Sequence, residues 1–416
     1  MGKYVIKGGN KIDGKIRIES AKNSVLPLLA GAILTDEKVI IKDCPKIKDV
    51  LNMIKILNSI GVKTEFCGND LCVDASSVYG YTLPSILTGE LRSSVFMLGA
   101  LISKTNKAVI SYPGGCDIGL RPIDIHIKAL KDIGVKIEEI GGELYCTTEC
   151  VNGREIYLDF PSVGATENIM LASVFCIGET TIKNSAKEPE IVDLMNFLNS
   201  MGAEIYGGGT ATIVIKGVKK LHGTVFKPMP DRIEAGTYLI AGAITGGNIE
   251  ISNVKAENIS SLLHKLSDNT CKISINNDII YLKSDGKRKC FNIETNPYPG
   301  FPTDLQSQMT TLATVSEGTS VITENIFEMR FKFARELIKM GADVKVFGKT
   351  VVVTGVKKLH GANVKAEDLR GGASLVLAGI CAEGKTVVQD IKHIERGYLD
   401  LEKKLMSLGV DIKKKN

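Results

Sequence analysis

The sequence predicts an α/β (α+β) fold of two domains, built from six repeats of about 70 residues with three repeats in each domain. The first observation is length, because 416 residues exceed the ~250–300 that usually share one hydrophobic core. The second is a helix–glycine–strand phrase that recurs along the chain. The third is an Ala/Gly-rich helix that leads into a strand and recurs at a similar interval.

The composition is that of a soluble globular protein, with 44% hydrophobic and 24% charged residues. The net charge of +5 is small and scattered, and tryptophan is absent, so we expect no nucleic-acid partner. No run approaches the ~18 apolar residues of a membrane span, and the first residues lack the apolar stretch of a signal peptide. We therefore expect a cytoplasmic protein without a membrane span.

The ten cysteines are expected to be mostly buried free thiols. The pairs Cys67/Cys72 and Cys146/Cys150 lack the paired spacing and histidine partners of a zinc site. We expect neither a metal nor a cofactor. The histidines show no catalytic pairing and are expected to be structural; they are His126, His222, His264, His360 and His393.

The helix–glycine–strand phrase, as in LKDIGVKIE at 130–138, is typical of a helix that ends at a glycine and continues into a strand. Six copies lie 68 to 73 residues apart, and one of them, LSDNTCKIS, has Thr270 in place of glycine. The other five copies carry Gly61, Gly134, Gly202, Gly341 and Gly409.

The Ala/Gly-rich phrase, as in LLAGAILTDEKVIIKD and LVLAGICAEGKTVVQD, predicts a helix that is small and apolar on all sides. Such a helix is buried inside layers of sheet. Each repeat is therefore expected to hold one buried helix, one amphipathic helix and several strands.

A third phrase, YVIKGGNKIDGKIRI at 4–18, recurs at 213–227 and 351–365. Two copies fall at the predicted domain joins. We predict that residues 22–229 form one continuous inserted domain, and that residues 1–21 and 230–416 form the other.

The predicted start of the buried helix carries a cation in four of the six repeats. A cation is unfavourable at the N-terminus of a helix, which is the positive end of the helix dipole. It is favoured there only if the side chain and the helix N-terminus bind the same anion. For any single residue, a solvated charge or a pair with a nearby acid is the better explanation. Recurrence in both domains instead favours a two-domain clamp on a highly anionic ligand. The six positions are Lys22, Arg92, Gly164, Arg232, Asp304 and Arg370.

Asp304 is the acid among these cations and cannot serve to bind an anion. It is either a general base or an N-cap that follows Thr303. Three further arginines stand in similar contexts, and arginine suits bidentate capture of phosphate or carboxylate. They are Arg121, Arg330 and Arg396.

The glycine-rich segment PGGCDIGLRPIDIH at 113–126 predicts a mobile loop. It follows a β-branched run at 108–112 and precedes an amphipathic helix opened by Pro122. Cys116 lies five residues before Arg121, and a cation and a helix start both favour a thiolate. A glycine-rich hairpin with an incidental cysteine is the alternative.

Nearly the whole chain resembles the UDP-N-acetylglucosamine enolpyruvyl transferases (1-carboxyvinyltransferases) of the EPSP synthase-like superfamily. The resemblance rests on the motifs SAKNS, LRSS, PGGCxIGxRPID, PSVGAT, PDRIEAGT, FPTDLQ, DLRGGASLVLAG and IERGY. The shikimate-pathway enolpyruvyl transferase lacks the loop with the cysteine. That enzyme, or a non-catalytic paralogue of the same fold, is the alternative.

The resemblance implies two inside-out α/β barrels with the active site in the cleft between the domains. It implies transfer of the enolpyruvyl group of phosphoenolpyruvate to the 3′-hydroxyl of UDP-N-acetylglucosamine, by addition and elimination with release of phosphate. This is the first committed step of peptidoglycan synthesis. The expected partners are thus these two substrates, with fosfomycin as a covalent inhibitor at Cys116.

The family's residue roles carry over to matching positions. Asp304 would take the proton of the 3′-hydroxyl, and Cys116 would act as general acid at the methylene carbon. Lys22, Arg121 and Arg396 would hold the phosphate, with Lys22 and Arg396 also counted as catalytic. Arg330 and Arg370 would hold the carboxylate. The nucleotide sugar would be held by Asn23, Arg92, Arg121, Pro122, Ile123, Asp124, Ile125, Phe160, Pro161, Ser162, Val163 and Ile326.

Two positions depart from the family pattern. Some members have lysine where Phe160 stands, which puts one contact to the nucleotide in doubt. Arg232 is not a substrate ligand in the family, so the repeat argument over-counts it.

Overall fold

The computed structural model describes residues 2–114 and 123–415. These residues divide into two compact units, each described by itself below. The middle unit contains residues 20–114 and 123–229, and the terminal unit contains residues 2–19 and 230–415. The chain passes from one unit to the other after Glu19 and after Met229.

The middle unit holds helices and strands in alternation. Its helices are α1 (Lys22–Gly31), α2 (Lys48–Ser59), α3 (Ser85–Glu90), α4 (Phe96–Thr105), α5 (Asp124–Asp132), α6 (Val163–Ser173) and α7 (Pro189–Ser200), with 3-10 turns η1 (Ala32–Leu34) and η2 (Arg92–Val95). Its strands are β3 (Val39–Ile41), β4 (Lys63–Cys67), β5 (Asp70–Asp74), β6 (Lys107–Ser111), β7 (Lys136–Ile140), β8 (Glu143–Thr147), β9 (Glu155–Tyr157), β10 (Glu179–Lys183), β11 (Glu204–Tyr206), β12 (Thr212–Lys216) and β13 (Val225–Phe226). The sheet orders are β13-β3-β5-β4, β6-β8-β7 and β11-β12-β10-β9.

The terminal unit repeats this plan. Its helices are α8 (Arg232–Thr245), α9 (Ser260–Asp268), α10 (Gln306–Ala313), α11 (Ala334–Lys339), α12 (Leu369–Cys381) and α13 (Leu401–Ser407), with turns η3 (Ala256–Ile259), η4 (Thr303–Leu305) and η5 (Ile391–Arg396). Its strands are β1 (Lys3–Lys7), β2 (Asp13–Arg17), β14 (Asn248–Ser252), β15 (Lys272–Asn276), β16 (Ile279–Lys283), β17 (Asn292–Glu294), β18 (Thr319–Thr323), β19 (Asp343–Phe347), β20 (Thr350–Thr354), β21 (Asn363–Lys365), β22 (Lys385–Gln389) and β23 (Asp411–Lys415). The sheet orders are β15-β16-β14-β2, β17-β18-β20-β19 and β21-β22-β1-β23.

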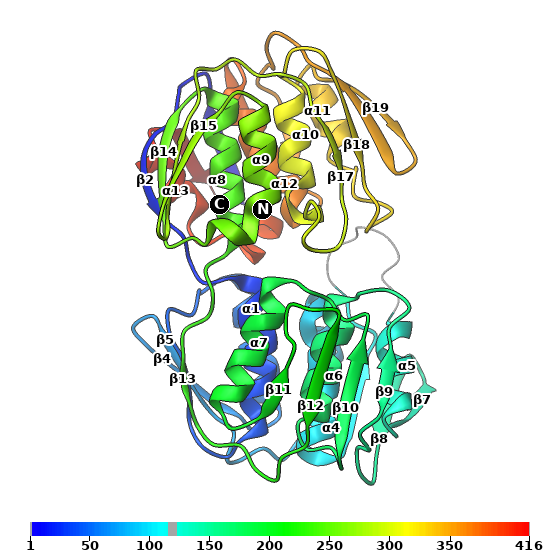
Figure 1. Ribbon diagram of the computed structural model, residues 1–416. Coiled ribbons are helices and arrows are strands. Elements are labelled where there is room, and N and C mark those ends of the chain that lie inside the picture. Colours follow the sequence, from blue (N-terminus) through cyan, green and yellow to red (C-terminus); the bar gives the residue numbers. More distant parts are fainter. Residues whose placement is uncertain (1, 115–122, 416) are drawn as a thin grey trace. The chain divides into compact units, whose positions relative to one another are not determined.

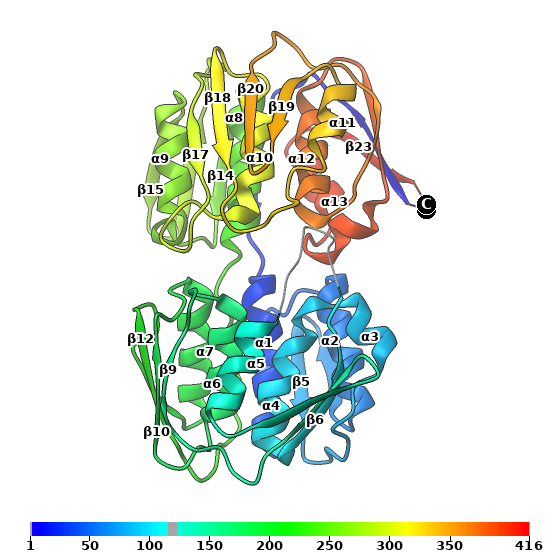
Figure 2. The same ribbon diagram turned by 90° about the vertical axis from the view of Figure 1, so that its right-hand side faces the viewer.

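In each unit the Ala/Gly-rich helices lie inside and the sheets lie outside (Figures 1 and 2). All eight residues of α10 are buried, and α8 is buried from Arg232 to Ile244. The amphipathic α2 buries Val50, Met53 and Leu57 along one face. The predicted α/β fold with fully buried helices is therefore confirmed.

Two local expectations differ from the structure. The helix after the glycine-rich segment begins at Asp124, because Ile123 (φ −103°, ψ 17°) has left the helical region and is its N-cap. Pro122 lies outside the described residues. All nine described cysteines are free, but only Cys44, Cys146, Cys176 and Cys271 are buried. The expectation of mostly buried thiols is wrong for these nine, because Cys67 and Cys290 are exposed and Cys72, Cys150 and Cys381 are half-buried.

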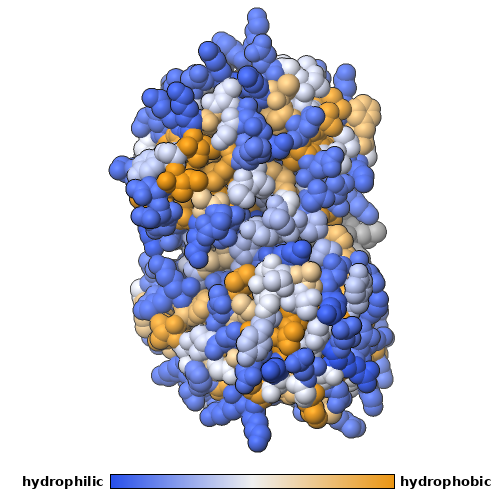
Figure 3. Space-filling model, viewed as in Figure 1, coloured by the Kyte–Doolittle hydropathy of each residue, from blue (hydrophilic) through white to orange (hydrophobic). Residues whose placement is uncertain are grey.

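Polar and charged side chains cover most of the face shown in Figure 3, and apolar side chains form scattered patches there. Among the described residues, no helix combines the length and apolar character that crossing a membrane requires. The same residues contain no group of three or more His, Cys, Asp or Glu side chains arranged to hold a metal ion.

Candidate active site

The six positions predicted at helix starts all stand in the first two residues of a helix or 3-10 turn. Lys22, Arg92 and Arg232 are the first residues of α1, η2 and α8. Gly164, Asp304 and Arg370 are the second residues of α6, η4 and α12. The alignment of the buried helices thus located these positions correctly in both units.

In the terminal unit, Asp304 lies between two arginines. Arg330 Nη2 is 2.7 Å from Asp304 Oδ1, and Arg370 Nη2 is 2.9 Å from Oδ2. Arg370 Nε donates a further bond of 3.2 Å to Oδ2. Both arginine side chains are only 4% exposed, whereas the aspartate is 24% exposed. The N-cap of this turn is Pro302, so the N-cap interpretation of Asp304 is wrong.

The charges of this cluster stabilise one another. Burial lowers the pKa of Arg370, but the charges of Asp304, Tyr398 and Asp231 together more than offset this effect and leave the pKa above its ordinary value. Arg330 also carries a buried Nε–H that has no acceptor within residues 2–114 and 123–415. A buried donor without an acceptor is costly, so this atom is suited to an added anion. The ring of Phe327 lies 5.2 Å from the Arg330 guanidinium.

The ring of Tyr398 packs against the guanidinium group of Arg370, with its centroid 5.4 Å from the guanidinium carbon. Tyr398 belongs to the IERGY motif, two residues after Arg396. Arg396 itself ends η5 and is half-buried. The IERGY motif includes Tyr398, but no role for this side chain could be predicted from the sequence.

In the middle unit, Lys22 forms an ion pair of 3.2 Å with Asp49, in the first turn of α2. Asp49 is 2% exposed and Lys22 is 13% exposed, so this pair is largely removed from solvent. The sequence showed no sign of this pairing beyond an acid near a helix start. Arg92 donates through Nη1 to the Pro113 carbonyl, 3.2 Å away, at the start of the glycine-rich segment. Asn23 follows Lys22 in α1 and is half-buried.

The segments expected to hold the nucleotide sugar stand at other helix starts. Ser162 is the N-cap of α6, and its Oγ accepts from Ala165 N at 3.3 Å. Phe160 is 40% exposed before this cap. The half-buried side chains around these starts are Ile125, Pro161, Val163 and Ile326, whereas Ile123 is buried and Asp124 is exposed. Cys116, Arg121 and Pro122 lie outside the described residues.

Buried hydrogen bonds of Asn168 link helix α6 to α5 and to the segment from Val95 to Gly99. Asn168 Nδ2 lies 3.1 Å from His126 Nδ1 and donates to the Val95 carbonyl at 3.1 Å. Asn168 Oδ1 accepts from Gly99 N at 2.6 Å. His126 is in α5, Asn168 in α6 and Gly99 in α4, so one amide joins three helices. These contacts give His126 a structural role.

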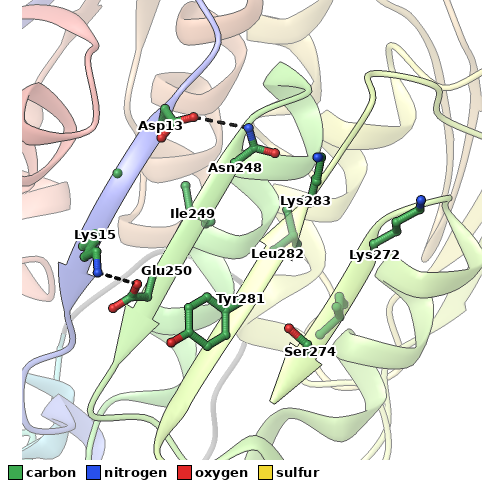
Figure 4. A pocket seen from close by; sticks show the side chains of 12 residues that line it. Asp13, Lys15, Asn248, Ile249, Glu250, Lys272, Ser274, Tyr281, Leu282 and Lys283 are labelled. Carbon is green, nitrogen blue, oxygen red and sulfur yellow. Dashed lines mark hydrogen bonds and ion pairs between the residues drawn. The ribbon is translucent and has the colours of Figure 1, made fainter. Parts of the chain in front are cut away.

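A hollow of about 500 Å³ lies over the sheet β15-β16-β14-β2, with its polar side chains facing one another (Figure 4). Lys15 pairs with Glu250 at 2.8 Å, and Asn248 donates to Asp13 at 3.2 Å. No predicted site residue lines it. The paired charges make it a solvated sheet face and not the candidate active site.

The chain matches the family model of EPSP synthase (3-phosphoshikimate 1-carboxyvinyltransferase) over residues 6–405. The fold is similar to the enolpyruvyl transferase NikO from Streptomyces tendae, with TM-score 0.90 and 26% identity over 99% of this chain and 98% of that one. An EPSP synthase from Acinetobacter baumannii shares the fold at TM-score 0.77 and 17% identity, over 100% of both chains. The class is therefore that of the enolpyruvyl, or 1-carboxyvinyl, transferases.

Relatives with higher identity narrow the class. UDP-N-acetylglucosamine 1-carboxyvinyltransferase 2 from Caldanaerobacter subterraneus subsp. tengcongensis is 52% identical over 99% of both chains. UDP-N-acetylglucosamine 1-carboxyvinyltransferase 1 from Clostridium acetobutylicum is 46% identical over 100% of both. The chain belongs to the UDP-N-acetylglucosamine 1-carboxyvinyltransferase family.

Proposed function

We propose that this chain transfers the enolpyruvyl group of phosphoenolpyruvate to the 3′-hydroxyl of UDP-N-acetylglucosamine and releases phosphate, the first committed step of peptidoglycan synthesis. Family membership supports this activity. The structural observation that carries the proposal is the carboxylate of Asp304 held between Arg330 and Arg370. We place the reaction in the cytoplasm, where phosphoenolpyruvate and the nucleotide sugar are formed.

Arg330 and Arg370 already bind a carboxylate, and we assign to them the carboxylate of phosphoenolpyruvate. The buried Nε–H of Arg330 supplies a donor that Asp304 does not use. A substrate carboxylate at these arginines competes with Asp304 for the same guanidinium groups. Asp304 then loses part of the positive charge that stabilises its anion and becomes a stronger base.

The proposed chemistry balances without a cofactor. The Cys116 thiol protonates the methylene carbon of phosphoenolpyruvate, while the 3′-hydroxyl attacks the neighbouring carbon and Asp304 takes the hydroxyl proton. In the elimination, the tetrahedral ketal returns a methyl proton to the Cys116 thiolate and releases phosphate, which takes the proton held by Asp304, and the double bond is restored. Fixed cations stabilise the charge on phosphate without reorganisation, and we assign this role to Lys22, Arg121 and Arg396.

The assigned residues come from both compact units. Lys22 and Arg92 belong to the middle unit, whereas Asp304, Arg370 and Arg396 belong to the terminal unit. We propose that the substrates contact both. The nucleotide sugar is assigned to the starts of α1, η2, α5 and α6 and to Ile326, with Phe160 giving an aromatic surface where some relatives have lysine.

Phosphate release from phosphoenolpyruvate, measured with and without UDP-N-acetylglucosamine, tests the proposal. Release is expected only with the nucleotide sugar, and shikimate-3-phosphate is expected not to replace it. Asp304→Asn should lower kcat by about 10²–10⁴-fold, the usual contribution of a general base. Asp343→Asn, at an exposed position of β19, is the matched control and should retain wild-type turnover.

The same assay tests Cys116. Preincubation with fosfomycin should abolish release by the wild-type chain, and Cys116→Asp should keep turnover and resist the inhibitor. Activity with shikimate-3-phosphate would support the shikimate-pathway alternative. Binding of the nucleotide sugar without any turnover would support a non-catalytic paralogue.

A further inference from the structure

Arg370 is held by side chains from several elements of the terminal unit. Asp304 binds its Nε and Nη2, and the Tyr398 ring lies against its guanidinium at 5.4 Å. Tyr398 is 2% exposed and Arg370 is 3% exposed. An aromatic face against a buried guanidinium limits the rotamers available to the arginine.

The guanidinium of Arg370 donates a hydrogen bond to the hydroxyl of Tyr398, which has two further partners on the inner helices α8 and α10. Thr237 Oγ1 on α8 lies 2.8 Å from it, and Gln308 Nε2 on α10 donates to it at 3.3 Å. Gln308 Nε2 also donates to Thr237 Oγ1 at 3.2 Å. All three side chains are at most 2% exposed, so their hydrogen bonds do not compete with bulk water.

The direction of each bond follows from the donors available. Thr237 Oγ1 lies 2.8 Å from the Ile233 carbonyl, which can only accept, so the threonine proton is committed there. The Tyr398 proton must then point to Thr237. The Gln308 amide is oriented by Ser307 Oγ, which donates to Gln308 Oε1 at 2.9 Å. The chain of donors therefore runs from Gln308 through Tyr398 and Thr237 to Ile233, and it fixes the position of the Tyr398 hydroxyl.

Tyr398 also anchors the segment that carries Arg396. Tyr398 N donates to the Ile394 carbonyl at 3.2 Å, and Gly397 N donates to the same oxygen at 3.1 Å. A fixed tyrosine two residues after Arg396 restricts the backbone at the end of η5. One buried side chain thus constrains two of the arginines assigned to anion binding.

We propose that Tyr398 is a positioning residue for phosphoenolpyruvate, set by Thr237 and Gln308, and that it acts through Arg370. This inference rests on the proposed function. Tyr398 touches no reacting atom in this role. Its removal changes the affinity for phosphoenolpyruvate, because Arg370 is assigned to the substrate carboxylate, and leaves the affinity for the nucleotide sugar unchanged.

Steady-state kinetics of Tyr398→Phe test the inference, since this substitution keeps the ring and removes the hydroxyl. The KM for phosphoenolpyruvate is expected to rise about tenfold, the effect of one hydrogen bond of ~1.4 kcal/mol. The kcat and the KM for UDP-N-acetylglucosamine should stay within about twofold of wild type. Thr237→Val should reproduce the effect, and Thr237→Ser, which keeps the hydroxyl, should restore the wild-type KM.

Tyr238→Phe is the matched control. Tyr238 is also fully buried on α8, beside Thr237, and its hydroxyl has no hydrogen-bond partner among the described residues. Its substitution should leave all three constants unchanged. An equal KM for phosphoenolpyruvate in Tyr398→Phe and Tyr238→Phe overturns the inference, and so does a parallel rise in both KM values. If the wild-type protein itself shows no turnover, that result contradicts the proposed function and not the role assigned to Tyr398.

Discussion

Thr270 stands in a backbone conformation that glycine occupies in the other five copies of its phrase. Its φ is +76°, and the five glycines have φ between +88° and +98°. A β-branched residue is strained in this left-handed region, where glycine is not. The Oγ1 of Thr270 donates to the Lys287 carbonyl, which offsets part of the strain.

We expect Thr270→Gly to raise the free energy of unfolding by up to about 1 kcal/mol, because a strain of ~1–3 kcal/mol is relieved while the lost hydrogen bond and the added chain entropy offset part of it. Urea unfolding measures the change. Gly409→Thr is the reverse control, since φ is +89° there and an added Cβ would meet no atom within 4 Å. It should lose about 1–2 kcal/mol. If Thr270→Gly is no more stable than the wild type, the interpretation of Thr270 as a strained residue is wrong.

Asp304 shows where residue-level prediction from the sequence stops. Its place among cations at helix starts indicated a base or an N-cap, and the choice depended on which side chains reach it in space. Arg330 and Arg370 lie 26 and 66 residues further along the chain. No local pattern shows that both guanidinium groups meet this one carboxylate, because that contact depends on how η4 and α12 pack.

At the scale of elements, the repeated phrases predicted the helix starts well. Helices α1, α6, α8 and α12 begin within one residue of the predicted positions, because each phrase must bury a similar small helix. Helices α4 and α10 begin at Phe96 and Gln306, after the 3-10 turns that hold Arg92 and Asp304. The caps were less predictable. Asp231, Asp368 and Ser162 accept hydrogen bonds at the starts of α8, α12 and α6. The corresponding N-cap before α1 is Ala21, without a side-chain bond.

The histidines of the KKLHG phrases also play equivalent parts. His222 N donates to the Met201 carbonyl at 2.8 Å, and His360 N donates to the Met340 carbonyl at 2.8 Å. Each ring lies against the glycine that ends the preceding helix, Gly202 or Gly341. The structural role expected for these two histidines agrees with these contacts.

The first turn of α8 contains a pH-sensitive contact with α13. Glu234 accepts from Glu19 N at 2.9 Å and from Lys404 Nζ at 2.7 Å, and Lys404 also lies 3.1 Å from Glu19 Oε1. Burial raises the pKa of Glu234 to about 7, although Lys404 lowers it. The folded chain therefore holds a proton that the unfolded chain releases at lower pH.

The stability contributed by this proton is complete below the ordinary carboxyl pKa of ~4.5 and is lost as the pH rises to about 7. Between pH 5 and pH 7 we expect a loss of about 2 kcal/mol from Glu234, since one pKa unit corresponds to ~1.4 kcal/mol. The free energy of unfolding, measured with urea between pH 5 and pH 7, should therefore fall less steeply with pH in Glu234→Gln than in the wild type. Glu204→Gln, at an exposed position of β11, should keep the wild-type slope, and equal slopes for the two variants would contradict the assignment.

At the scale of the whole molecule, each unit contains a sheet in which strands far apart in the sequence pair with one another. Strand β1 lies inside the sheet β21-β22-β1-β23, paired antiparallel with β22 and β23. Strand β2 adds to β14, and β13 adds to β3 in the middle unit. The recurrence of the third phrase at 4–18 and 213–227 indicated such joins. The sequence could not show the strand partners, because they depend on pairings more than 180 residues apart, such as Val225 with Ile40.

Because these pairings lie within one unit, we expect a substitution in the core of one unit to destabilise that unit and leave the other unit unchanged. Ile6 of β1 is fully buried and pairs with Thr386 and Ile412, so Ile6→Ala should cost about 2–4 kcal/mol. Hydrogen exchange should accelerate in β22, β23 and the rest of the terminal unit, while β5, β10 and β12 of the middle unit keep wild-type protection.

Ile213→Ala gives the converse test, since Ile213 is fully buried in β12 between β10 and β11. It should accelerate exchange in the middle unit only. The N-terminal segment then acts as part of the terminal unit, although 210 residues separate it from the segment that begins at Pro230. Uniform acceleration throughout the chain by either variant would instead mean that the two units unfold as one cooperative block.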